Sequence, residues 1–204
     1  MPHDPRGSAP SAGGTGEKIM QNSLMTQPRP SDVGVLSFRY LGAYEIDELA
    51  DLWGALHQQH TVTAPHLADI ISAVSMDESW RRRRAQYLAW LTDPDTMAIL
   101  AESGDDPAGY AMVTVKESSQ GSWDRGERVA VVQTFAIDPE YSDTGVGSKL
   151  LEEVRRQLGA MGVRDIEFSA LATSSEDIRF LEQEGFQPFV TTMVCRVDAF
   201  GAHD

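Results

Sequence analysis

The stretch from Asp138 to Lys149 (DPEYSDTGVGSK) contains the residue types of a ligand-binding loop. It follows an apolar, strand-like run that ends at Ile137 and leads into the amphipathic, helix-like run 147–161. Glycines at positions 145 and 147 permit unusual backbone dihedral angles and a close approach of a ligand to the main chain. Because the first N–H groups of a helix are unpaired and the helix dipole is positive there, such a loop can bind phosphate groups.

Two familiar nucleotide-binding signatures are absent from this stretch. It has no third glycine at the spacing of a dinucleotide-binding fold and no Gly-Lys-Ser/Thr of a P-loop. A Gly-x-Gly pair by itself also fits a plain tight turn between a strand and a helix. Whether the loop binds phosphate therefore depends on the elements that surround it.

Those elements indicate one mixed α/β domain. An antiparallel meander of three strands precedes the loop, and a strand–helix–strand pattern includes it. The predicted strands span residues 35–40, 97–102, 109–116, 128–137, 165–171, 188–190 and 192–197. The predicted helices span residues 46–56, 67–74, 147–161 and 175–184. A further helix is expected to be capped by Ser75 or Asp77 and to end at Leu91. Gly162 and Gly185 are expected to end the last two helices.

The chain divides into an N-terminal tail and one domain. Residues 1–32 hold five of the ten prolines and no periodic apolar pattern, so we expect a disordered tail or a leader there. Residues 33–204 form the predicted domain, and the hydrophobic fraction of the chain, 41%, suffices for a core. The single cysteine, Cys195, cannot form an internal disulfide, which fits a reducing, cytoplasmic location. Its strand-like context favours a buried structural thiol over a nucleophile.

The charge balance is strongly acidic, with 17 lysines and arginines against 31 aspartates and glutamates and a net charge of −14. This balance argues against nucleic acid or an anionic membrane as the main partner. No apolar run approaches the roughly 20 residues of a membrane helix. The acidity is compatible with a cationic substrate, and also with a surface that only aids solubility. The basic run Arg81 to Arg84 surrounds most of a helix, so we expect it to pair with the acidic surface.

Three side chains outside the loop are candidates for acid–base chemistry. Glu102 ends a predicted strand, and His57 and His60 are three residues apart on one predicted helix face. A pair of histidines at this spacing can also bind a metal, but no third ligand is evident, and we predict no metal site. A partly exposed pair at a helix end, and deprotonation relayed by water, remain as alternatives.

Taken together, the loop and its neighbours resemble the acyl-coenzyme A signature of the GNAT N-acetyltransferase superfamily. The strand end matches at Phe135, Ile137 and Pro139, and the loop and helix match at Gly145, Val146, Gly147, Leu150 and Leu151. The run Arg179-Phe180, Glu182 and Gly185-Phe186 is similar to the closing helix and Gly-Phe turn of the family. The order of elements agrees across residues 35–197, and the segment from Glu78 to Tyr87 resembles an N-terminal helix of some members.

This resemblance implies a mixed, mostly antiparallel central sheet with a splayed strand pair, flanked by helices. It implies transfer of an acetyl group from acetyl-CoA to a primary amine of a small molecule or peptide, by direct attack in a ternary complex. The implied cofactor-binding residues are Phe135, Ile137, Thr144, Gly145, Val146, Gly147, Ser148 and Lys149. The backbone N–H of Ala136 or Ile137 would polarise the thioester carbonyl, in a gap between this strand and the strand around 166–169.

The sequence departs from the family pattern at several positions. Ser142 replaces the usual Gln or Arg at the head of the loop, and Asp143 adds an anion beside the expected phosphates. Leu181 stands where the family often has a tyrosine that protonates the departing thiolate. Ser174 and Asp177 stand where asparagine and alanine are frequent.

These departures keep two other functions open. One is a catalytically weak or silent GNAT-fold protein that binds acyl-CoA or a protein partner. The other is an unrelated α/β binding module whose glycine loop is only a turn. The acceptor pocket is expected in residues 42–92 and 117–127, where the acidic charge mildly favours a cationic amine, and a homodimer is an open possibility.

Overall fold

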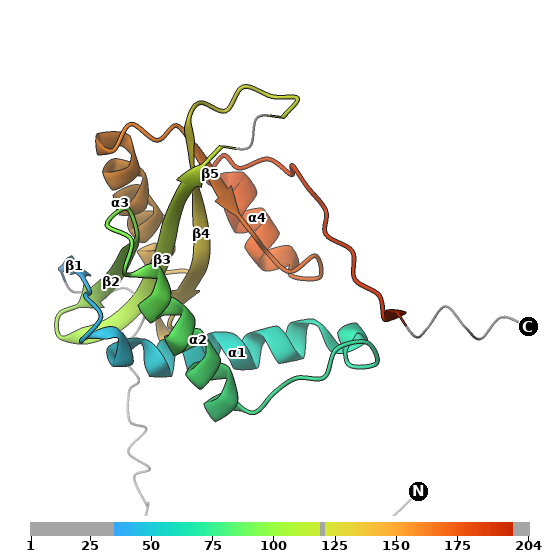
Figure 1. Ribbon diagram of the computed structural model, residues 1–204. Helices are drawn as coiled ribbons and strands as arrows, with labels where there is room; N and C mark the ends of the chain where they lie inside the picture. Colours follow the sequence, from blue (N-terminus) through green and yellow to red (C-terminus); the bar gives the residue numbers. More distant parts are fainter. Residues whose placement is uncertain (1–34, 119–120, 198–204) are drawn as a thin grey trace, which may run out of the picture.

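A mixed five-stranded sheet forms the centre of the computed structural model, which describes residues 35–118 and 121–197 (Figure 1). The strands lie in the order β1-β2-β3-β4-β5. Their bounds are β1 Leu36–Tyr40, β2 Met97–Ser103, β3 Asp106–Glu117, β4 Arg128–Ile137 and β5 Asp165–Phe168. Strands β1 to β4 pair antiparallel, and β5 runs parallel to β4. The predicted mixed, mostly antiparallel sheet is confirmed; the predicted tail at 1–32 lies outside the described residues.

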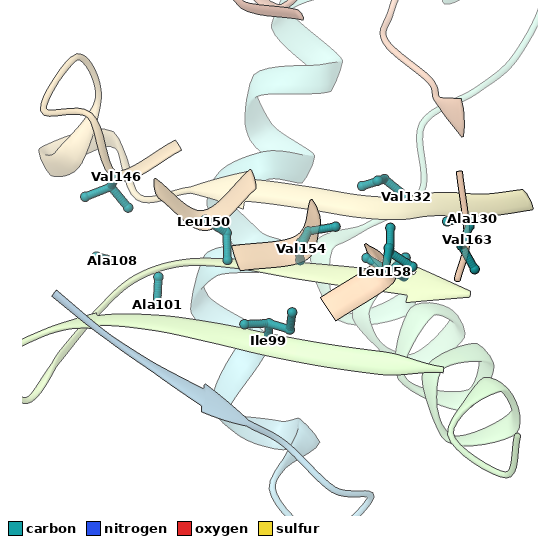
Figure 2. Close-up of a cluster of buried hydrophobic side chains, with 12 residues drawn as sticks. Ile99, Ala101, Ala108, Ala130, Val132, Val146, Leu150, Val154, Leu158 and Val163 are labelled. Carbon is teal, nitrogen blue, oxygen red and sulfur yellow. The ribbon is translucent and has the colours of Figure 1, made fainter. Parts of the chain in front are cut away.

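Helix α3 (Val146–Ala160) covers one face of the sheet. Its apolar residues recur at helical spacing, and Leu150, Val154 and Leu158 are all buried. Figure 2 shows these side chains against Ile99 and other side chains of the strands. Gly162, with a φ of 73°, follows the helix in the left-handed conformation that commonly ends helices. The core on this face therefore fixes where α3 begins, and with it the glycine loop.

A second core covers the opposite face of the sheet. It packs the 3₁₀ turn η1 (Ile46–Leu49), helix α1 (Ala50–Thr63) and helix α2 (Met76–Trp90) against β2, β3 and β4. Ser75 caps α2, since its side chain accepts a hydrogen bond from the Glu78 N–H at 3.3 Å. Helix α4 (Ser175–Gln183) follows β5 in the chain and lies near the β5 edge of the sheet (Figure 1).

A β-bulge at Gln133 exchanges the two faces of strand β4. Met112 of β3 pairs with Thr134, whereas the next residue, Val113, pairs with Val132, so Gln133 is the additional residue. Before the bulge, Val132 faces the α3 core; after it, Ala136 faces the α1–α2 core. The insertion thus turns the odd-numbered residues 135 and 137 toward the α3 side of the sheet.

The structure contradicts the prediction of two strands at 188–190 and 192–197. Within the described residues the segment after Phe186 is extended but joins no sheet, and Met193 is 86% exposed. Alternating apolar residues fit a sheet, but a strand forms only where a neighbouring edge accepts its hydrogen bonds. Cys195 lies in this segment and is exposed, so its prediction as a buried thiol is also wrong.

The prediction of a helix at 67–74 is wrong as well. Only the 3₁₀ turn η2 (Pro65–Leu67) forms there, and turns and bends follow it. Ile71 is half exposed, so this segment lacks the buried face that stabilises a short helix. Helix α1 instead continues to Thr63, beyond the predicted end of the first helix at residue 56.

A buried hydroxyl network joins helix α2 to the sheet. The Tyr87 hydroxyl donates to Thr134 Oγ1 at 2.6 Å and lies 3.0 Å from the Tyr110 hydroxyl. Burial raises the pKa of both phenols, so both remain neutral near pH 7. The network fixes Thr134, which follows the bulge, against the helix.

We expect the substitution Tyr87→Phe to lower the free energy of unfolding by about 1–2 kcal/mol, because it leaves Thr134 and Tyr110 with fewer buried partners. Urea unfolding followed by circular dichroism measures the effect. Tyr44→Phe is the matched control, since Tyr44 is fully exposed and its change should stay within about 0.5 kcal/mol. Equal stability of the two variants would contradict a stabilising role of the network.

Candidate functional site

A cleft of about 1040 Å³ lies where strand β4, the glycine loop and helix α4 meet helices α1 and α2. Its floor is the second half of β4, from Val131 to Ile137. Residues 141–143, 145, 147 and 148 of the loop line one end. Trp53, His60 and Arg83 of α1 and α2 also line it. The elements predicted to surround the loop therefore enclose a space of substrate size.

The cleft begins where β4 and β5 separate. The two strands pair from Val129 and Asp165 to Val132 and Phe168, and their pairing stops there. Strand β4 continues for five more residues, 133–137, and pairs on that stretch with β3 only. The separation coincides with the bulge at Gln133, because a bulge bends a strand and increases its twist. The strands form an open wedge rather than a closed pair.

The hydrogen-bond register shows which backbone groups of β4 face this wedge. The Asp138 N–H donates to the Ala108 carbonyl at 2.9 Å, so this pair is hydrogen-bonded. Because such pairs alternate in an antiparallel ladder, Ala136 bonds to β3, whereas Phe135 and Ile137 direct their N–H and C=O groups away from it. Of the two predicted oxyanion donors, Ala136 and Ile137, the register directs only the N–H of Ile137 away from β3.

The glycine loop provides a row of unpaired backbone donors. Gly145 adopts a φ of 86° and precedes α3, and the first bond of the helix joins Lys149 N–H to the Gly145 carbonyl at 3.1 Å. Among the described residues, the N–H groups of residues 145–148 have no backbone or side-chain acceptor within hydrogen-bond distance. Gly145, Gly147 and Ser148 also line the cleft. Unpaired N–H groups at a helix start attract an anion such as a diphosphate.

Three other predicted loop residues have structural roles. The Thr144 hydroxyl donates to the Tyr141 carbonyl at 2.5 Å, and its N–H donates to the same carbonyl at 3.3 Å. The Val146 side chain is buried in the core under α3. Lys149 is exposed and pairs with Glu152 at 2.9 Å. None of the three side chains lines the cleft; those of Thr144 and Val146 hold the loop in shape, and that of Lys149 pairs within α3 at the surface.

Asp143 is the one anionic side chain of the loop that lines the cleft. It adopts a φ of 59°, in the left-handed region, and its side chain is exposed. Asparagine tolerates the same backbone conformation, so its substitution changes the charge and little else.

We therefore expect Asp143→Asn to tighten acetyl-CoA binding by about 3- to 10-fold at low salt, since it removes a negative charge beside the free N–H groups. Isothermal titration at 20 and 300 mM salt measures this difference, which should shrink at the higher ionic strength. Equal affinity of wild type and variant at low salt would show that Asp143 lies too far from the bound phosphates to repel them.

Three aromatic rings line the wedge beneath the loop. Phe135 of β4 stacks on Phe180 of α4 with ring centroids 6.0 Å apart, and Phe168 meets Phe135 edge to face at 5.4 Å. A Cβ atom on Gly147 would lie 3.4 Å from the Phe180 ring, so glycine lets α4 approach the start of α3. The aromatic cluster (Phe135, Phe168 and Phe180) borders the cleft without filling the loop.

The structure brings His60, and not His57, to the cleft. Burial lowers the pKa of His60; the negative Asp177 raises it in part, and the charges of His57 and Arg83 lower it further. The imidazole is therefore neutral near pH 7 and able to accept a proton. Glu102 does not line the cleft, because it lies on β2, two strands away from β4; there Arg39 binds its carboxylate at 3.0 Å.

Arg83, which lines the cleft, was not singled out as a site residue by the sequence. Arg83 lies with its guanidinium carbon 4.5 Å from the centroid of the Trp53 ring, and both line the cleft. The run of four arginines gave no signal as to which of them faces inward. Leu181 also lines the cleft, and its side chain has no proton to donate.

Two features are absent from the described ranges 35–118 and 121–197. No group of three or more His, Cys, Asp or Glu side chains is arranged there to hold a metal ion. None of the helices there has both the length and the apolar character that a bilayer crossing requires.

Comparison with known proteins gives a family match. The profile of the acetyltransferase (GNAT) family matches residues 53–186. The comparison with curated proteins found no match.

Solved structures share the fold at low sequence identity. A GCN5-related N-acetyltransferase from Ralstonia eutropha is 16% identical with a TM-score of 0.62, over 80% of this chain and 99% of that one. An aminoglycoside acetyltransferase from an uncultured soil metagenomic sample, in complex with trehalose, is 13% identical with a TM-score of 0.59. The match covers 79% of this chain and 96% of that one. AAC(6')-Iy, in complex with the bisubstrate analogue CoA-S-monomethyl-acetylneamine, is 12% identical with a TM-score of 0.57. The match covers 79% of this chain and 97% of that one.

Proposed function

Because the chain belongs to the acetyltransferase (GNAT) family, we propose that it transfers an acetyl group from acetyl-CoA to a primary amine of a small molecule or peptide. One observation carries this proposal: the free N–H groups of residues 145–148 and the unpaired edge of β4 border the same cleft. A diphosphate fits the first feature, and an extended amide-bearing arm fits the second. These are the two recognition elements that a CoA thioester requires.

The residues of the chain would divide the reaction as follows. Gly145, Gly147 and Ser148 bind the diphosphate through their N–H groups, and Phe135 and Ile137 pair with the pantetheine arm. The Ile137 N–H donates to the thioester carbonyl and stabilises the negative charge that develops on its oxygen. Acetyl-CoA, when bound, supplies the acyl group and a good leaving group.

His60 is the proposed general base. It accepts a proton from the acceptor amine, whose nitrogen then forms a bond to the acyl carbon as the C–S bond breaks. The electron pair of that bond leaves on sulfur, and water protonates the thiolate, since Leu181 cannot. The enzyme acts mainly by positioning the two substrates, which fits the wedge between β4 and β5.

Isothermal titration with acetyl-CoA, followed by a thiol-release assay across a panel of amines, tests the proposal. We expect binding in the micromolar range and release of CoA thiol that depends on the amine. An absence of heat at high micromolar acetyl-CoA would overturn it.

A second function is favoured by Asp143 and Leu181, which weaken the cofactor site and remove a proton donor. In that case the chain binds acyl-CoA or a protein partner without turnover. Binding of acetyl-CoA without turnover of any amine would select this function over the first. A cytoplasmic location and a homodimer belong to the same set of proposals, and they rest on the single cysteine and on the resemblance to the family.

A further inference from the structure

Three of the four consecutive arginines of α2 pair with carboxylates, and the fourth, Arg83, has none as a partner among the described residues. Arg81 and Arg82 bind Glu78 at 2.7 and 2.5 Å. Arg84 binds Asp47 at 2.5 Å. Among the residues described by the structure, no carboxylate lies within 4.0 Å of Arg83, the only one of the four that lines the cleft. Its charge is therefore available to a ligand.

The position of Arg83 suits the recognition of a carboxylate. Its guanidinium lies over the Trp53 ring at 4.5 Å and near the Tyr87 ring at 5.7 Å. The ring faces attract the cation, and the planar guanidinium carries N–H groups that can form two parallel hydrogen bonds with a carboxylate. Trp53 is itself held in place, because its indole N–H donates to Ser79 Oγ at 3.1 Å in a buried contact. The cation is thus pre-oriented rather than mobile.

The rest of the cleft separates charges of opposite sign. Arg83 lies on α2, while Glu176 and Asp177 line the cleft from α4. Arg179 also lines the cleft, but it is exposed and its Nε donates to the Ser175 carbonyl at 3.2 Å. The overall charge of the chain favours a purely cationic amine. The arrangement of charges in the cleft instead matches a ligand that has both an ammonium and a carboxylate group.

We propose that Arg83 binds a carboxylate of the acceptor, so that the acceptor is an amine that also bears a carboxylate, as amino acids and peptides do. This inference rests on the proposed acetyl transfer. It makes Arg83 a specificity-determining residue that is separate from the cofactor loop.

The test compares matched acceptors and matched variants. The twenty L-amino acids and their α-carboxamides are assayed for thiol release with wild type, Arg83→Gln and Arg81→Gln. Arg81 is the control, since it carries the same charge on the same helix and is 72% exposed outside the cleft. We expect wild type to prefer carboxylates over carboxamides, and Arg83→Gln to raise the KM of the carboxylates about 10-fold or more without changing that of the carboxamides.

A binding experiment separates this inference from the proposed function. Titration with N-acetyl-L-amino acids is followed by the fluorescence of the four tryptophans, of which Trp53 and Trp90 line the cleft, and it needs no turnover. Binding that is lost in Arg83→Gln and kept in Arg81→Gln supports the carboxylate site even if no amine is acetylated. Equal turnover of carboxylates and carboxamides, or a weaker acetyl-CoA affinity in Arg83→Gln, would overturn the inference and leave acetyl transfer intact.

Discussion

Replacing Gly147 with aspartate is expected to weaken acetyl-CoA binding more than 100-fold while the protein remains folded. Gly147 lies in the first turn of α3 and lines the cleft beside the free N–H groups. A carboxylate about 5–6 Å from one phosphate charge repels it by about 3 kcal/mol at an effective dielectric constant of 20, and the diphosphate carries two such charges. Because 1.4 kcal/mol corresponds to a factor of ten, about 3 kcal/mol exceeds 100-fold.

The fold should tolerate this change. The new Cβ atom would meet the Phe180 ring at 3.4 Å, a contact that a small rotation of the ring relieves. A carboxylate in the first turn of a helix also interacts favourably with the helix dipole. Thermal unfolding should therefore show a melting temperature within a few degrees of wild type.

Gly147→Asn is the matched control for charge, because asparagine has nearly the same shape as aspartate and is neutral. Isothermal titration of both variants with acetyl-CoA measures the difference. We expect the asparagine variant to lose about 10-fold or less. Equal losses in the two variants would mean that the diphosphate does not bind at this helix start.

Replacing His60 with alanine is expected to lower kcat/KM about 100-fold near pH 7, with little change in acetyl-CoA affinity. The size of the loss is that of a typical general base, and His60 lines the cleft. His57→Ala is the control, since His57 does not line the cleft, and its kcat/KM should stay within about 3-fold of wild type. Loss of activity in His57→Ala alone would assign the base to the other histidine.

The pH profile provides an independent check on His60. Burial lowers its pKa below the ordinary value of 6.5, so the neutral, active form predominates above that pH. The kcat/KM of wild type should therefore be constant above about pH 6.5 and fall on the acid side. Below pH 6.5 the imidazole of His60 binds protons more readily in the unfolded state than in the folded state. The free energy of unfolding should therefore also fall as the pH drops below 6.5. In His60→Ala the acid limb of kcat/KM should disappear; its persistence would assign it to another group.

Much of the fold could be predicted from the sequence, because its periodic segments carry their own burial pattern. Strand β4 has the bounds 128–137 that were expected, and α3 differs by one residue at each end. The prediction of strands at 188–190 and 192–197 was wrong. Alternating apolar residues indicate that a segment can fit a sheet, but they do not indicate that a sheet edge is available to it.

The candidate site was predictable in its loop and less so in its opposite wall. The glycines at 145 and 147 define a local backbone feature that neighbouring residues in the chain determine. His60 and Arg83 belong instead to helices whose rotation about their axes is set by packing against β4. Neighbours in sequence such as His57 and Arg84 have the same chemistry, so only the tertiary structure distinguishes them.

The additional residue in β4 has a consequence for how β4 and β5 come apart. Deletion of Gln133 would restore an uninterrupted ladder, in which residues 134–137 keep the faces and the β3 partners that they have now. The deletion would instead remove the local bend and the added twist at the point where the pairing with β5 stops. The length of β4 at this point therefore bears on the opening between the two strands, and not on which side chains reach each core.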